Sequence, residues 1–347
     1  MRSIAILGVV MALTWVAPPP VEAQSTGAAP MAARKHIKLG VSGRPDQASL
    51  EIALRRGYFE QEGLDIETVQ GTTGQEMLPS LAANQLQAAS GSPNAGLFNA
   101  LNRGINIRIV GDFAHIGDAR DRTVAIMARA DLVESGAIKN FADVKGKVIS
   151  QGPGPGQITE IIFQKLFDQA KITPADVTIK YINFPDTLAA FASKTLDVTF
   201  LIEPLVTAAE RQNLARVIVP GGAIDPGAEL SIWIFSPEFA KDKDAATRFM
   251  VAFLKGARDY YDAFFLGKNK DATIALLTQY LPVKDPKLWE TSRQYTDLNG
   301  RVNVENLKFQ AAFHTKRGNV SGPVPDIEKF LSPEFSEAAV KQLGERK

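Results

Sequence analysis

A short loop of glycine and proline is the first feature of the sequence that could do chemistry. Residues 152–156, GPGPG, separate an apolar strand from a helical pattern that starts at Ile158. Glycine lets a guest approach the backbone closely, and proline holds φ fixed. A helix start carries unpaired N–H groups and partial positive charge, which suit an anion or a polar acceptor. We therefore expect Gly154, Gly156 and Gln157 to contact a bound molecule.

The familiar nucleotide-binding loops do not fit this stretch. No Lys-Ser or Lys-Thr pair follows it, as a P-loop requires, and Gln157 stands where a dinucleotide fingerprint needs its third glycine. Taken alone, the loop is equally typical of a connector whose glycines and prolines only shape a turn.

The same order of strand, small-residue loop and helix recurs along the chain. Loops of Gly, Ser, Thr and Pro follow the apolar strands predicted at 36–41, 65–69, 87–89, 149–150 and 197–202. Parallel strands present their carboxyl ends at one edge of a sheet, where α/β proteins bind ligands. Ser92 stands where an N-cap belongs and Pro93 where the first helical residue belongs. The residues that we expect at this edge are Ser42, Arg44, Gln47, Thr73, Ser92, Asn94 and Glu203, with His115 after a strand predicted at 105–110.

The charged residues of these loops point to two different solutes. Arg44 could pair with an anionic head group, whereas Glu203 would favour an amine or another N–H donor. We expect two helix starts and Arg44 to outweigh one carboxylate, which predicts a small organic anion such as a sulfonate or carboxylate. His115 is either a structural histidine or a ligand contact, and Phe184 and Trp233 are either apolar contacts or core residues.

Composition excludes several classes of function. The chain has no cysteine, which rules out disulfides, thiol nucleophiles and cysteine metal sites. Its three histidines have no metal-ligand spacing, and it lacks a G-x-S-x-G elbow. We therefore expect no catalytic residue, no metal and no cofactor. A formal net charge of +1 gives no reason to expect nucleic acid as a partner.

The first 23 residues have the pattern of an export signal. Arg2 precedes an apolar run over residues 4–16, and Val21-Glu22-Ala23 form a small-x-small cleavage site. Residues 24–35 have the low complexity of a disordered tail. Because a lipid-modified cysteine is impossible, we expect a mature protein that diffuses freely in a periplasm.

The alternation of strands and helices predicts an α/β fold, and the length predicts two lobes. Both sheets are expected to be parallel and covered by helices on both faces. After about residue 240 the strand pattern stops, and 245–280 and 325–343 predict amphipathic helices that wrap the first lobe.

Four stretches carry a resemblance to a known family: ALRRGYFEQEGLDIETVQGTTG, FADVKGKVISQGPGPG, LAAFASKTLDVTFLIEPLV and PVPDIEKFLSPEF. Over about residues 36–343 the chain resembles the periplasmic solute-binding proteins for alkanesulfonates, taurine, nitrate and thiamine-pyrimidine precursors. That resemblance implies a two-lobed type II periplasmic-binding-protein fold with two hinge strands and a ligand cleft. Lobe 1 would comprise 36–122 and 238–347, and lobe 2 would comprise 123–237, with crossings near 123–129 and 230–235.

The resemblance also implies partners. A monomer would deliver its small-molecule solute to the permease of an ABC importer in the inner membrane. The alternatives left open are a thiamine-pyrimidine-like or amine-bearing solute, a thiamine-pyrimidine synthase-like enzyme, and a sensor partner that presents its loaded form to a receptor. Enzymes of that kind carry a cysteine cluster, which this chain lacks.

Overall fold

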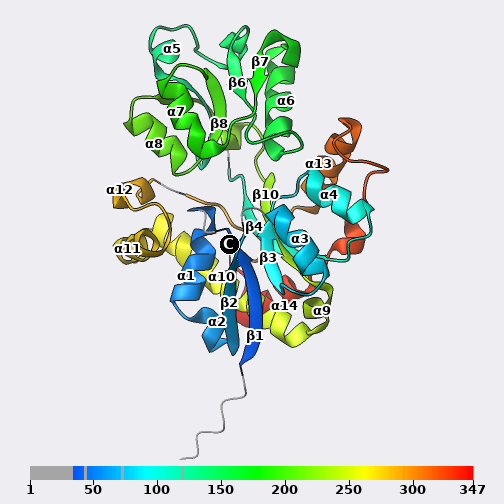
Figure 1. Cartoon of the computed structure of the whole chain (residues 1–347). Coiled ribbons are helices and arrows are strands. Elements are labelled where there is room, and N and C mark those ends of the chain that lie inside the picture. Colours follow the sequence, from blue (N-terminus) through cyan, green and yellow to red (C-terminus); the bar gives the residue numbers. More distant parts are fainter. Residues whose placement is uncertain (1–33, 43–44, 72–73, 119–120, 292, 347) are drawn as a thin grey trace, which may run out of the picture. The chain divides into compact units, whose positions relative to one another are not determined.

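The strands of the described residues form two five-stranded sheets (Figure 1). The computed structural model describes residues 34–42, 45–71, 74–118, 121–291 and 293–346. The predicted export signal and residues 24–33 of the predicted tail lie outside these ranges. The first strand begins at Lys35, so the predicted tail extends one residue too far.

The first sheet has the strand order β2-β1-β3-β10-β4. Each of these strands contains apolar residues whose side chains are buried in the core. Its members are β1 (Lys35–Val41), β2 (Leu64–Gln70), β3 (Ala88–Gly91), β4 (Arg108–His115) and β10 (Glu229–Phe235). Because β4 ends at His115, this histidine closes the strand and does not follow it, contrary to the predicted strand over 105–110.

The second sheet has the order β7-β6-β8-β5-β9. Its members are β5 (Val124–Arg129), β6 (Val148–Ser150), β7 (Thr178–Lys180), β8 (Val198–Ile202) and β9 (Ala215–Pro220). The Gly-Pro loop leaves the carboxyl end of β6, and Glu203 directly follows β8. Both predicted loops therefore start at the same edge of this sheet.

The prediction of purely parallel sheets is wrong at one strand in each. β1 pairs with β2 and β3 in parallel, and β6 pairs with β7 and β8 in parallel. In contrast, β10 is antiparallel to β3 and β4, and β5 is antiparallel to β8 and β9. β5 and β10 are the strands that the chain enters on arriving from the other sheet, so each starts at the edge where its antiparallel neighbours end.

Helices cover both faces of each sheet, as predicted. One face of the first sheet shares a core with α1 (Ala48–Arg55), α2 (Tyr58–Gln61), α9 (Pro237–Lys241), α10 (Lys243–Phe264) and α14 (Glu334–Leu343). Its other face packs on α3 (Gly74–Ala82), α4 (Ala95–Asn102) and α13 (Val304–Lys316). The second sheet lies between α5 (Ala130–Glu134) with α6 (Ile158–Ala170) and α7 (Thr187–Ala192) with α8 (Leu205–Arg211).

The segment predicted as helical over 245–280 is divided in the structure. α10 is followed by α11 (Lys270–Tyr280), and Gly267 between them has a φ of +73° that ends helical geometry. α12 (Pro286–Trp289) follows. The segment predicted over 325–343 starts with a 3₁₀ turn, Ile327–Phe330, and becomes α14 only at Glu334. The other 3₁₀ turns are Pro45–Gln47, Phe141–Val144, Pro174–Asp176, Phe184–Asp186 and Gly221–Ala223.

The chain passes between the two sheets twice. It leaves the first sheet after β4 and enters the second at β5, and it returns between β9 and β10. These passages, 116–123 and 221–228, directly precede the two apolar runs expected at the crossings. β10 belongs to the first sheet, although the range expected for lobe 2, 123–237, includes it. The boundaries of the two lobes remain a prediction.

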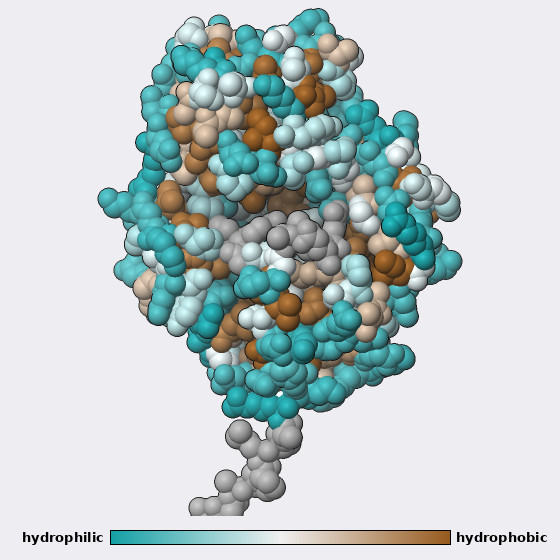
Figure 2. All heavy atoms as spheres, in the orientation of Figure 1, coloured by the Kyte–Doolittle hydropathy of each residue, from teal (hydrophilic) through white to brown (hydrophobic). Residues whose placement is uncertain are grey.

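The visible face of the protein is mostly hydrophilic, with hydrophobic residues in scattered patches (Figure 2). Most large apolar side chains are buried in the cores instead. Among the described residues, none of the helices combines the length and the apolar character that crossing a membrane would require.

Candidate functional site

A cavity of about 180 Å³ lies where loops of the two sheets meet. Parallel strands of both sheets direct their carboxyl ends to it, which is the expected place for a ligand. The loops and strand ends of the first sheet contribute Asp46, Ser92, Asn94, Ala114, His115, Leu230, Ser231, Gln294 and Tyr295. Those of the second contribute Thr123, Val124, Pro153, Gln157, Ile158, Thr159, Phe184, Phe200, Ile202 and Glu203.

Five of the residues predicted at this edge line the cavity: Ser92, Asn94, His115, Gln157 and Glu203. Ser42, Gln47, Gly154 and Gly156 are described but are not among its lining residues. Arg44 and Thr73 lie outside the described residues. The structure therefore gathers side chains from three loops and one strand end that are up to 111 residues apart in sequence, from Ser92 to Glu203.

The start of α4 differs from its prediction. The N-cap is Asn94, whose Oδ1 accepts a hydrogen bond from the N–H of Leu97 at 3.2 Å. Ser92 and Pro93 therefore precede the helix. Asparagine caps a helix as well as serine does, and the sequence offers both in one short loop, so local pattern could not separate them.

The Gly-Pro loop meets the start of α4 directly. The N–H of Ala95 donates to the carbonyl of Gly156 at 3.0 Å, and the N–H of Gly156 donates to Oε2 of Glu160 at 3.0 Å. Asn94 Nδ2 lies 3.5 Å from Gln157 Oε1. The N–H of Gly156 is therefore not available to a solute in this structure, because the carboxylate of Glu160 in the first turn of α6 already accepts that hydrogen.

The backbone conformation at position 156 and the close approach of Ala95 both require glycine there. The φ of Gly156 is +79°, which disfavours residues with a side chain, and a Cβ there would lie 2.7 Å from Cβ of Ala95. Gly154 has neither constraint, since a Cβ there would meet nothing within 4 Å. The two glycines that the sequence presents as equivalent therefore have different roles.

Gln47 has a structural role beside the cavity. Its Oε1 accepts from the N–H of Ser42 at 3.1 Å, and its Nε2 donates to Ser90 Oγ at 3.3 Å. The side chain is buried and links the loop after β1 to the end of β3. Its neighbour Asp46, which the sequence analysis did not single out, lines the cavity instead.

Glu203 brings a carboxyl group with an unusual pKa to the wall. Burial raises the pKa of Glu203 to about 7, against the opposing effect of two hydrogen bonds from Thr207. Those bonds run from the Thr207 N–H to Oε2 at 3.0 Å and from Thr207 Oγ1 to Oε1 at 2.8 Å. Near neutral pH this group therefore exists in both protonation states.

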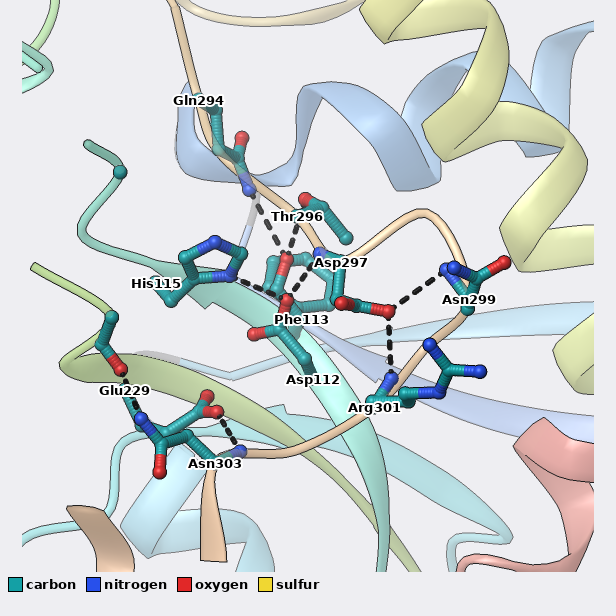
Figure 3. Close-up of polar contacts among 12 residues, drawn as sticks. Asp112, Phe113, His115, Glu229, Gln294, Thr296, Asp297, Asn299, Arg301 and Asn303 are labelled. Atoms are coloured by element: carbon teal, nitrogen blue, oxygen red, sulfur yellow. Dashed lines mark hydrogen bonds and ion pairs between the residues drawn. The ribbon is translucent and has the colours of Figure 1, made fainter. Parts of the chain in front are cut away.

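His115 is the basic group among the described lining residues. Its Nδ1 lies 2.9 Å from Oδ2 of Asp112, a fully buried carboxylate (Figure 3). Burial lowers the pKa of His115, but the charge of Asp112 and this hydrogen bond outweigh it, so the pKa is raised overall. The positive form of His115 thus persists to higher pH than that of an ordinary histidine.

One whole segment of the wall has no signal in the sequence. Residues 294–303, here called the strap, run along β4, which is an edge strand of the first sheet. The N–H of His115 donates to the carbonyl of Tyr295, and the N–H of Asp112 donates to that of Gly300. Gln294 and Tyr295 line the cavity, and Oε1 of Gln294 is buried without a partner in the described structure. The strap has no periodic pattern that could have revealed it.

The two apolar candidates have different outcomes. Phe184 lines the cavity and packs on Phe200 with ring centroids 6.1 Å apart. Trp233 is fully buried in the core of the first sheet, edge-on to Phe113 and Phe249, so of the two alternatives it is a core residue.

The comparisons with known proteins agree with this architecture. A family model described as NMT1/THI5 like matches residues 44–263. A candidate binding protein of Bacillus subtilis (strain 168), YtlA, is 23% identical over 277 residues, which cover 74% of this chain and 80% of YtlA. Among solved structures, the periplasmic aliphatic sulphonate binding protein SsuA of Escherichia coli has a TM-score of 0.67 at 19% identity, over 86% of this chain and 92% of SsuA.

An enzyme shares the same fold. The desulfurization enzyme DSZB has a TM-score of 0.63 at 16% identity, over 89% of this chain and all of DSZB. The likeness to these structures shows the fold, so the predicted two-lobed binding-protein fold is confirmed. With a family model matched over most of its length and the fold of binding proteins, the chain belongs to the NMT1/THI5-like family.

Proposed function

We propose that this protein is the solute-binding component of an ABC importer. The observation that carries the proposal is the cavity at the meeting edges of the two sheets, lined from both. Its volume of about 180 Å³ is below that of sites for drug-sized ligands, which favours a small solute. The protein would be exported by its signal peptide, act as a periplasmic monomer and hand the solute to the permease.

The described walls favour a solute that donates hydrogen bonds. Asp46 and Glu203 are acidic, and among the described lining residues none is lysine or arginine. Gln294 adds a buried acceptor that has no donor in the described structure. A buried acceptor without a donor is costly, and a solute N–H or O–H would remove that cost. Of the two predicted solute classes, these groups favour the amine-bearing or pyrimidine-like one.

A small organic anion is the second candidate. The raised pKa of His115 favours negative charge nearby, and Arg44 is two residues from the lining residue Asp46 in sequence. The structural neighbour SsuA is named for sulphonates. If the solute is an anion, Arg44→Ala should weaken its binding at least tenfold, about 1.4 kcal/mol.

A thermal-shift screen tests the proposal and separates the two solute classes. Amines, aminopyrimidines, sulfonates, carboxylates and nitrate would each be added to the purified protein, and hits measured by calorimetry. A ligand that binds only the folded state raises the free energy of unfolding by about 2.7 kcal/mol at 100 times its Kd. Shifts with amines or aminopyrimidines support the favoured class, and shifts with sulfonates, carboxylates or nitrate alone support the anion. No shift with any class contradicts the proposal.

Catalysis and sensing are the competing functions. The absence of cysteine removes thiol chemistry and the cysteine cluster expected of a thiamine-pyrimidine synthase-like enzyme. Each screened compound would be recovered after incubation with the protein and analysed by NMR. Recovery unchanged supports binding, and a product contradicts it. A permease and an ATPase encoded beside this gene would favour transport over a sensor role.

A further inference from the structure

Two buried acidic side chains lie beside the cavity and have no part in the function proposed above. Asp112 of β4 is 0% exposed, and Glu229, the first residue of β10, is 1% exposed. Burying an ionised carboxylate without a cation is strongly unfavourable. In the part of the chain that the structure describes, Asp112 forms an ion pair with His115 and Glu229 forms none with a lysine or arginine.

Each carboxyl group has one oxygen occupied by donors. Asp112 Oδ2 accepts from Nδ1 of His115 and from the N–H of Asp297. Glu229 Oε1 accepts from the N–H of Asn303 (Figure 3). The other two oxygens, Asp112 Oδ1 and Glu229 Oε2, are buried and have no donor among the described residues. Because β10 and β4 are paired strands, the two carboxyl groups lie on neighbouring strands, and a single proton between them would satisfy both oxygens.

We infer that Asp112 and Glu229 share one proton, and that this shared proton holds the strap against the first sheet beside the cavity. Protonated Glu229 donates from Oε2 to Oδ1 of Asp112, whose other oxygen, Oδ2, faces Nδ1 of His115. Burial, followed by the charge of Asp112, raises the pKa of Glu229. Glu229 is therefore the member of the pair that keeps the proton.

The two carboxyl groups bind the strap at two points. Asp112 accepts a hydrogen bond from the N–H of Asp297, near the middle of the strap, and Glu229 accepts one from the N–H of Asn303, at its end. The three joined segments, β4, β10 and the strap, all supply cavity residues, including His115, Ser231 and Gln294. Asp112 and Glu229 do not line the cavity, so they are positioning residues. The consequence for a solute rests on the function proposed above.

The surrounding charges set the pH response. His115 lies on β4 beside Asp112, Asp297 lies on the strap, and Asp121 acts on His115 from the passage after β4. Asp297 accepts from the backbone N–H of Arg301, whose guanidinium pairs with Glu345 instead. Apart from His115, these neighbours near the pair are acidic. Loss of the shared proton at high pH would place two like charges side by side and loosen the strap.

The first test counts protons in the solute-free protein. Glu229→Gln places an N–H where the proton would lie and keeps the acceptor for Asn303. A group whose pKa is higher in the folded state than in the unfolded state contributes its full stabilisation below the unfolded pKa. This contribution is lost as pH rises through the folded pKa. Wild-type protein should therefore lose stability relative to Glu229→Gln as pH rises above about 5, with a slope that corresponds to about one proton released on unfolding.

The second test follows the strap by hydrogen exchange, measured as protection factors at several pH values. The amides of Asp297 and Asn303 should stay protected in Glu229→Gln and lose protection in Glu229→Ala. In the wild type their protection should fall as pH rises. The amide of Gln294, which donates to the hydroxyl of Tyr260, reports the cavity wall and should follow them.

These outcomes do not depend on finding a solute, so they can fail independently of the proposed function. Equal pH slopes for wild type and Glu229→Gln would show that no proton is shared. Unchanged protection of Asp297 and Asn303 in Glu229→Ala would show that the pair does not hold the strap. If Glu229→Gln does not fold, Asp112→Asn replaces it, because its amide can donate to ionised Glu229 and should likewise reduce the slope.

Discussion

At the scale of single residues, Glu203 controls how the site depends on pH. Its folded pKa of about 7 lies above the ordinary 4.5, so its contribution to stability is full below about 4.5 and is lost as pH rises through 7. Glutamine does not ionise, so the Glu203→Gln variant does not lose stability in this way. Between about pH 4.5 and pH 8 the free energy of unfolding of the variant, measured in urea, should exceed that of the wild type by up to about 3 kcal/mol.

Binding should respond to Glu203 in the opposite direction. Ionised Glu203 is the better acceptor, so the affinity for an amine-bearing solute should rise as pH passes through 7 in the wild type and stay flat in Glu203→Gln. Glu238→Gln is the control, because Glu238 is an exposed residue of α9 that pairs with Lys241 and does not line the cavity. A pH-independent affinity in wild-type protein would contradict the role of Glu203.

Gln294 provides a second prediction at this scale. Its buried Oε1 has no donor in the described structure, and we expect the solute to supply one. Gln294→Leu should weaken binding about threefold to tenfold, corresponding to one hydrogen bond. The solute-free variant should be about as stable as wild type, because the unsatisfied acceptor is lost together with a long 3.5 Å contact to the Phe113 carbonyl. Calorimetry and urea unfolding measure the two effects, and an unchanged Kd would exclude the contact.

At the scale of elements, the junction between the Gly-Pro loop and α4 can be tested with a matched pair of variants. Gly156→Ala forces a side chain into φ +79° and against Ala95, and should lower the free energy of unfolding by about 1–3 kcal/mol. It should also weaken binding, since Asn94 and Gln157 flank the junction. Gly154→Ala meets open space and should change stability by less than about 0.5 kcal/mol. Equal effects of the two changes would show that the junction is absent in solution.

At the scale of the whole molecule, Glu160 links elements of the two sheets. This residue of α6 is buried, lies 3.3 Å from Nε of Arg317 and accepts from Nδ2 of Asn319 at 2.8 Å. Arg317 and Asn319 directly follow α13, which packs on the first sheet. Glu160→Gln keeps the shape and removes the charge, so it should favour separation of the two halves.

The expected results are a larger radius of gyration in solution scattering without solute and a several-fold weaker Kd with it. Glu305→Gln is the control, because Glu305 is an exposed residue of α13 that pairs with Lys308 at the surface. If Glu160→Gln leaves both quantities at their wild-type values, the charge of Glu160 does not hold the halves together.

The sequence by itself determined the local elements and most of the edge where the cavity lies. Strand–loop–helix order follows from the spacing of apolar residues and from Gly and Pro between them, which are properties of neighbouring residues. This is why Ser92, Asn94, Gln157 and Glu203 could be identified from local pattern. The absence of cysteine excludes thiol chemistry by composition alone, whatever the fold.

Only the tertiary structure decided which of these residues share a cavity and what state their charges adopt. Gly156 and Gly154 have the same local sequence environment. Gly156, however, lies against Ala95 of α4, a helix that packs on the other sheet. The strap reaches the cavity because β4 is an edge strand with backbone groups to pair, which depends on strand order. Asp112 and Glu229 are 117 positions apart in sequence, yet they lie on paired strands, and burial raises the pKa of Glu229. Long-range contacts and desolvation have no signature in local sequence, because both depend on which distant segments pack together.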